Sequence, residues 1–141
     1  GDESAASVLG QVVGGDRNAK VRGTAAWALG QLDLRSAPKG LMDALADSST
    51  RLRTRAAWAL AEIGDSAAAP ALWTALGKER DATAMKAMVR ALIHSGERTE
   101  RLTRLLESKS PEVREMAIRG LAGRHGMGPW PWPEPRPRPF P

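Results

Sequence analysis

Apolar residues recur along the chain with helical spacing, in a pattern that repeats about every thirty residues. One stripe of a 3.6-residue helix is formed by Val21, Ala25, Leu29 and Leu32. The hexapeptide AAWALG at 25–30 returns as AAWALA at 56–61, and weaker copies follow. The copies start at positions 21, 52, 84 and 113, with separations of 31, 32 and 29 residues. This spacing is the length of one helical hairpin and predicts a repeat array.

A second kind of predicted helix lies between these segments and carries leucines four residues apart. Its pairs are Leu41 with Leu45, Leu72 with Leu76, and Leu102 with Leu106. Prolines stand near two of the starts, where a missing N–H is tolerated. We therefore expect helix pairs at about 18–47, 50–78 and 81–108, with single helices at 4–14 and 111–124. Neither helix of a pair can bury its stripe alone, so each pair must stack on the next.

The motif carries a resemblance to a known repeat. Val-Arg-x-x-Ala-Ala-Trp-Ala-Leu-Gly, with Ile63-Gly64-Asp65 and Pro70-Ala71-Leu72 after the second copy, resembles the HEAT or HEAT-like (PBS-lyase-type) helical repeat. The third copy departs from it, with Arg90 where Trp58 stands. The resemblance covers roughly residues 4–126 and implies an all-α fold, a right-handed α-solenoid. It also implies that arginines at the start of the first helix bond acidic turn residues of the adjacent hairpin, and that the array serves binding and assembly.

The predicted array is open at both ends. Residues 1–15 form an N-terminal half-repeat with only the second helix, and the repeats of 16–126 end in a half-repeat with only the first. Apolar side chains at these ends are the predicted subunit interfaces: Val8, Leu9, Val12 and Val13 at one, and Val113, Met116, Ala117 and Leu121 at the other. Head-to-tail contact would rebuild a repeat and give an open filament, or a ring if the rotation closes. The competing interpretation is a longer chain that supplies the missing helix upstream.

Residues 127–141 form a tail rich in Pro, Trp and Arg. Seven prolines alternate from 129 to 141, which excludes helix and sheet and predicts polyproline II. At about 3.1 Å per residue, the tail reaches roughly 40 Å. The side chains expected to dock on a neighbouring subunit are Trp130, Trp132, Arg136, Arg138 and Phe140. A linker that binds nothing is the alternative, although linkers seldom carry so many aromatic residues.

A candidate ladder for receiving this tail runs between the paired alanines of the copies. It consists of Trp27, Trp58, Arg90 and Arg119. Tryptophan faces accept prolines and arginines well. The alternative is that these tryptophans simply cover small residues of the adjacent hairpin.

Charge and composition limit the classes of partner that the chain is expected to bind. The net charge of +5 and the sequence pI of 10.4 raise nucleic acid as a partner, but the basic residues are spread through the repeats and flanked by acids, which disfavours it. No apolar run is long enough for membrane insertion. The absence of cysteine excludes disulfides. The compartment stays open, with an extracellular or cell-surface location expected only for a processed filament subunit.

Catalytic chemistry has little support in the sequence. His94 and His125 are the only histidines, and neither forms a His-Glu metal motif. With no phosphate loop and no activated nucleophile, the sequence predicts no catalytic residues, no metal, no cofactor and no enzyme. The preferred prediction is a structural protein that polymerises with itself, head to tail. The alternative is a protein- or peptide-binding scaffold domain of a larger protein, of the membrane-sensor kind.

Overall fold

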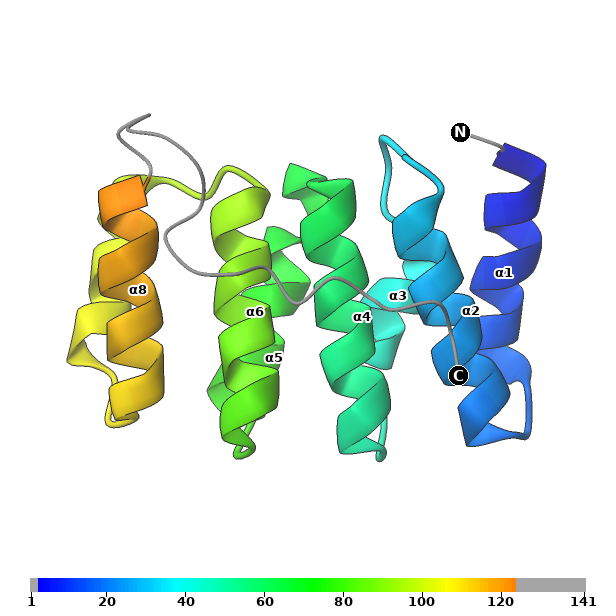
Figure 1. Cartoon of the computed structure of the whole chain (residues 1–141), viewed down its shortest axis with the longest axis horizontal. Coiled ribbons are helices and arrows are strands. Elements are labelled where there is room, and N and C mark those ends of the chain that lie inside the picture. Colours follow the sequence, from blue (N-terminus) through cyan, green and yellow to red (C-terminus); the bar gives the residue numbers. More distant parts are fainter. Residues whose placement is uncertain (1–2, 124–141) are drawn as a thin grey trace.

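The computed structural model describes residues 3–123, which form an all-α solenoid of two rows of helices (Figure 1). The first row contains α2 (Ala19–Gln31), α4 (Thr50–Ile63), α6 (Ala82–His94) and α8 (Pro111–Gly123). The second row contains α1 (Glu3–Gly15), α3 (Lys39–Ala44), the turn η1 (Ser66–Ala68) with α5 (Ala69–Lys78), and α7 (Thr99–Leu102) with η2 (Thr103–Glu107). No strand occurs in this part of the chain, so the predicted all-α solenoid is confirmed.

Each first-row helix begins at the same local signal. The side chains of Asn18, Ser49, Asp81 and Ser110 accept hydrogen bonds from the backbone N–H three residues later, at 3.2, 3.2, 2.9 and 3.3 Å. Such caps satisfy N–H groups that have no partner within the helix. Their separations equal those of the repeat starts, so the cap sets the beginning of every repeat.

Small residues set the distance between α2 and α4. A Cβ atom on Gly30 would lie 2.6 Å from Cζ3 of Trp58 and 3.3 Å from Cβ of Ala59. The indole ring of Trp58 therefore occupies the space that a side chain at position 30 would fill. This contact favours the interpretation in which tryptophan at this repeat position covers a small residue of the adjacent hairpin.

The core is a thin layer between the two rows. Its largest fully buried side chains are mostly leucines of α2 to α7, including Leu29, Leu41, Leu60, Leu72, Leu92 and Leu102. Alanines such as Ala26, Ala57 and Ala91 are completely buried between them. None of the helices described is both long and apolar enough to cross a membrane.

The contacts between the two rows follow the order of the chain. Among the first-row helices, each second-row helix packs mainly on the one that follows it: α1 on α2, α3 on α4, α5 on α6, and η2 on α8. The helix α3 also packs on α1. The connections explain this, because only residues 16–18, 79–81 and 108–110 separate three of these pairs, and short connections favour antiparallel neighbours. The expected division into three helix pairs between two half-repeats stays a prediction, because these contacts do not decide where a repeat begins. The predicted tail lies outside the described residues.

Candidate interaction surfaces at the ends of the array

Exposed large apolar side chains are found at the two ends of the solenoid. In residues 3–123 they are Val8 (59% exposed), Val21 (41%), Leu106 (39%) and Ile118 (58%). Val8 and Val21 lie on α1 and α2 at one end, whereas Leu106 and Ile118 lie on η2 and α8 at the other (Figure 1). Each end therefore presents one such residue from each row. We call these surfaces the N-terminal end face (Val8, Val21, Ala28) and the C-terminal end face (Leu106, Ile118, Ala122).

The C-terminal end face uses repeat positions that are buried elsewhere in the array. The repeat position of Ile118 is occupied earlier by Ala26, Ala57 and Val89, and each of these is 0% exposed. In those repeats another first-row helix follows, whereas none follows α8 within residues 3–123. Ile118 is therefore exposed because of where its repeat lies, not because its position faces solvent in every copy.

The N-terminal end face shows the same relation in reverse. Val21 corresponds to Leu52, Ala84 and Val113, none of which is more than 2% exposed. Likewise, Ala28 is half-buried, although Ala59 at the same repeat position is completely buried. Within the described part of the chain, no first-row helix precedes α2. Both end faces thus have the composition of surfaces that another repeat covers.

The structure places the predicted N-terminal interface residues differently from one another. Val8 is exposed, Leu9 and Val12 are half-buried against the core, and Val13 is buried. Only Val8 is therefore fully available, because α1 uses the others to pack on its own chain. Val21 is not among the predicted interface residues, because the sequence pattern predicts that its whole stripe lies inside the repeat.

The predicted C-terminal interface lies one residue away from the exposed surface. Val113, Met116 and Ala117 are buried within the chain, and Leu121 is half-buried. The apolar residues Ile118 and Ala122, which are exposed, each lie one position later than a predicted residue. The predicted stripe is the one that α8 uses to pack on α6 and η2, and the end face is its neighbour on the helix.

The candidate ladder for the tail is not a continuous exposed strip. Trp27 and Trp58 are half-buried, and Arg119 is exposed and pairs with Glu115 at 3.1 Å. Arg90, however, is buried, and its Nη2 donates to Oε2 of Glu62 at 3.1 Å. The docking of the tail stays a prediction, because its residues lie outside those described.

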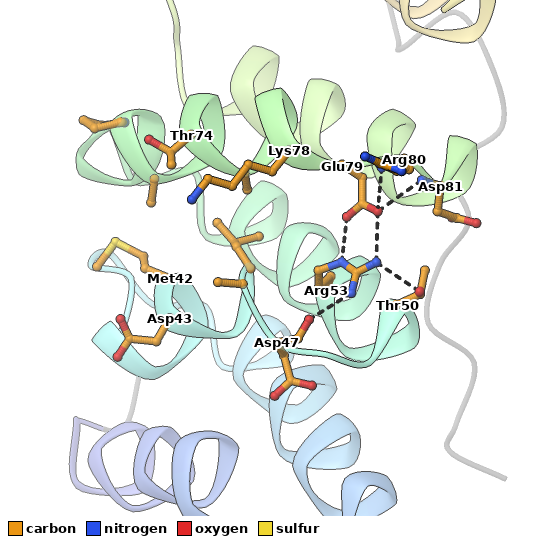
Figure 2. A pocket seen from close by; sticks show the side chains of 15 residues that line it. Met42, Asp43, Asp47, Thr50, Arg53, Thr74, Lys78, Glu79, Arg80 and Asp81 are labelled. Carbon is orange, nitrogen blue, oxygen red and sulfur yellow. Dashed lines mark hydrogen bonds and ion pairs between the residues drawn. The ribbon is translucent and has the colours of Figure 1, made fainter.

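An arginine clamp links adjacent repeats, as the repeat pattern implied. In Figure 2, Nε and Nη2 of Arg53 donate to the two carboxylate oxygens of Glu79 at 2.7 and 3.0 Å, and Nη1 donates to the backbone carbonyl of Asp47 at 2.8 Å. The Glu79 side chain is only 2% exposed. The hydrogen bond between Arg53 and Glu79 lowers the pKa of Glu79 and raises the pKa of Arg53, because it favours the charged form of each side chain. This pair joins α4 to the loop before α6.

The clamp lies at one side of an open groove of about 1050 Å³ between α3 and α5. Met42 and Asp43 contribute from α3, and Thr74 and Lys78 from α5. Charges of both signs line it, so it has no marked preference for an anion or a cation. Among the described residues, no group of three or more His, Asp or Glu side chains could hold a metal ion.

A polar cluster on the second row was not predicted. Trp73 is half-buried against the core, and its Nε1 donates to Oε2 of Glu97 at 2.6 Å. The guanidinium of Arg101 lies 5.3 Å from the centre of its ring. These partners come from the next repeat, and only their separation of about one repeat could have indicated the contact.

Comparison with known proteins shows which families and structures this helical array resembles. A profile described as HEAT repeats matches residues 6–93. Among solved structures, 17 chains match. One of them is in the complex of CpcE and CpcF of phycocyanin lyase from Nostoc sp. PCC7120, with 26% sequence identity and a TM-score of 0.67. The match covers 85% of this chain but only 52% of that one, so the chain spans about half the length of the structure it resembles. A comparison with curated proteins gave no match.

The structural match corrects one prediction. The lack of familiar catalytic residues in the sequence predicts the exclusion of an enzymatic function, but a similar helical array forms part of a lyase. That exclusion is therefore wrong. The matched array is also part of a two-protein complex, which agrees with a protein-binding helical repeat and with protein partners.

Proposed function

Because the chain belongs to the HEAT-repeat family, we propose that it is a protein-binding scaffold whose copies join end to end, with the C-terminal end face of one copy on the N-terminal end face of the next. One observation carries the proposal: the exposed large apolar side chains of residues 3–123 lie at the ends, at positions buried elsewhere in the array. Solenoids that remain single usually present polar faces there. Such a head-to-tail contact is heterologous, so it produces filaments unless it closes into a ring.

The contact between α2 and α4 supplies the expected geometry of the joint. There Gly30 approaches Ala59 so closely that a Cβ atom on Gly30 would lie 3.3 Å from the Cβ of Ala59. The same repeat positions at the joint are Ala122 of one copy and Ala28 of the next. Covering Ile118 and Val21 would remove two branched side chains from water, each contributing about 1 to 2 kcal/mol. Small side chains at 28 and 122 allow the close approach that this burial requires.

The tail is a second contact in this proposal. We place Trp130, Trp132, Arg136, Arg138 and Phe140 on the surface of the neighbouring copy, as their apolar and cationic groups suggest. Removal of residues 129–141 is then expected to weaken assembly without changing the stability of the array. Equal assembly by the truncated and full-length chains would remove the tail from the proposal.

Engineered cysteines test the joint directly, because the chain has none of its own. Ala28→Cys and Ala122→Cys are introduced together and oxidised mildly. The geometry predicts disulfides between copies, since Cβ atoms in disulfides lie about 3.5 to 4.5 Å apart. Non-reducing electrophoresis should show a ladder of dimers, trimers and larger species.

The matched control carries Ala122→Cys with Thr74→Cys, which is exposed on α5. It should give little cross-linking beyond random dimers. Monomer alone from the Ala28/Ala122 variant, or equal ladders from both variants, would contradict the proposed joint.

A second candidate function is favoured by the match to the CpcE and CpcF complex. In it, an end face would bind a different HEAT-repeat chain to form a lyase of the phycocyanin lyase type. A chain that stays monomeric at high concentration and binds phycocyanin in a sedimentation assay would favour this function over self-assembly. Absence of such binding would exclude phycocyanin as the partner.

A further inference from the structure

We propose that an ion pair between Arg114 of one copy and Asp16 of the next closes each joint. The inference rests on the end-to-end assembly proposed above and assigns a specific pair of charges to it. The partner that the two ends fit is therefore a second copy of this chain. A clamp of the same kind recurs inside the array.

Three arginines are held in the same way. Each is the fourth residue of its first-row helix, and its Nη1 donates to the backbone carbonyl of the residue six positions earlier. The bonds join Arg22 to Asp16 at 3.0 Å, Arg53 to Asp47 at 2.8 Å, and Arg114 to Ser108 at 2.6 Å. Because the bond from Nη1 to the backbone carbonyl is the same in all three, the guanidinium groups are positioned alike. The remaining N–H groups of Arg114 therefore have the same placement as those of Arg22 and Arg53.

Two of these arginines also reach the next repeat. Nη2 of Arg22 lies 3.6 Å from Oδ2 of Asp47, and Nε of Arg53 lies 2.7 Å from Oε1 of Glu79. Both acids stand five residues before the apolar residue that starts their repeat, in the loop between a second-row and a first-row helix. The clamp thus joins one repeat to the loop of the next.

Asp16 stands at the same repeat position as the two acids and has the same local geometry. The carboxylates of Asp16, Asp47 and Glu79 each accept a hydrogen bond from the backbone N–H two residues later, at 2.8, 2.8 and 3.1 Å. This bond anchors one oxygen of each carboxylate to the loop. Asp16 is therefore an acceptor of the same kind as the two that already bind arginine.

The two halves of the clamp are separated at the ends of the array. Arg114 has no following loop within residues 3–123, and Asp16 has no preceding first-row helix there. Between α6 and α8 the equivalent residues are Met85 and Ser108, so the array also stacks without the pair. The pair's two charges nevertheless stand at opposite ends, which makes the end faces electrostatically complementary.

The test uses two blocked chains that can form one joint only. Val21→Asp blocks the N-terminal end face of the first chain, and Ile118→Asp blocks the C-terminal end face of the second. Their mixture should give one heterodimer, whose Kd is measured by fluorescence anisotropy. Arg114→Gln in the first chain and Asp16→Asn in the second are then tested singly and together, and the asparagine keeps an oxygen for the N–H of Asn18.

Arg35→Gln in the first chain is the matched control. Arg35 is exposed in the loop between α2 and α3, away from α8, and its replacement removes the same charge. Denaturation of each variant alone checks that its fold is unchanged.

We expect each single change at the pair to weaken binding about tenfold and the double change to weaken it little further, which is a coupling of about tenfold. The coupling should fall as salt is raised. A heterodimer with no coupling, or one weakened equally by Arg35→Gln, would overturn the ion pair but leave end-to-end assembly standing. Absence of any heterodimer would overturn the assembly itself and the ion pair with it.

Discussion

The middle of the array and its ends contain the same repeat positions in different surroundings. Between α4 and α6, Ala57 is 0% exposed, whereas Ile118 at the same position on α8 is 58% exposed. Both positions are apolar, and the larger side chain is the one at the end. Burial in this solenoid therefore depends on whether a neighbouring repeat is present. Apolar residues at positions that lack a neighbour mark the surfaces where one is expected.

Leucine truncation should distinguish the two regions most strongly. Leu60 is 1% exposed, and Leu121 at the same repeat position is half-buried. Leu60→Ala should lower the free energy of unfolding by about 3 kcal/mol, and Leu121→Ala by roughly 1 kcal/mol, because the cavity at the end opens to solvent. Urea denaturation followed by circular dichroism, at concentrations where the chain is monomeric, measures both. Equal losses would contradict the comparison.

The clamp between α4 and α6 should contribute less than the core leucines. Glu79→Gln leaves Arg53 with a weaker acceptor, and we expect a loss of about 2 kcal/mol at neutral pH. Glu115→Gln is the matched control, since the Glu115 and Arg119 pair is exposed and such pairs contribute less than about 1 kcal/mol. A loss for Glu115→Gln as large as that for Glu79→Gln would show that burial of the clamp is unimportant.

The same clamp gives a pH dependence with a defined sign. Folding lowers the pKa of Glu79, mainly through the hydrogen bond from Arg53. The stabilisation is therefore present above the unfolded pKa of about 4.3 and is lost as pH falls through the folded pKa. The stability difference between the wild-type chain and Glu79→Gln should narrow below about pH 4. A constant difference down to the acid transition would contradict this assignment.

A smaller effect is expected where α2 approaches α4. A methyl group on Gly30 would collide with Trp58, so Gly30→Ala should destabilise by about 1 kcal/mol despite the better helix propensity of alanine. Gly77 on α5 has no atom within 4 Å of its Cβ position. Gly77→Ala should therefore stabilise by about 0.5 kcal/mol. Thermal denaturation of the two variants measures these opposite changes in stability. An increase in the stability of Gly30→Ala would mean that the indole of Trp58 moves aside easily.

The smallest effect on folding should come from Ile118→Asp. The end face of α8 is exposed in the single chain, so the free energy of unfolding should change by less than about 0.5 kcal/mol. Val89→Asp, at the same repeat position inside the array, should prevent stable folding because it buries a charge. Similar behaviour of the two variants in circular dichroism would remove the distinction between ends and interior.

The sequence was sufficient for the fold because its signals are local and periodic. Apolar stripes and the caps at Asn18, Ser49 and Asp81 set the first-row helices, and the repeated arginine indicated the clamp. The sequence was not sufficient for contacts that depend on how repeats stack. The burial of Arg90 depends on Glu62 from the preceding first-row helix, α4, 28 residues earlier. A helical stripe alone does not show which neighbouring face stays open on α8.

Sedimentation velocity over a series of concentrations tests the central claim most directly, with the wild-type chain and Ile118→Asp compared side by side. The end-to-end account predicts species that grow with concentration for the wild-type chain, and a folded monomer throughout for Ile118→Asp. A wild-type chain that remains monomeric at high concentration, or a variant that assembles as well as the wild type, would contradict the account.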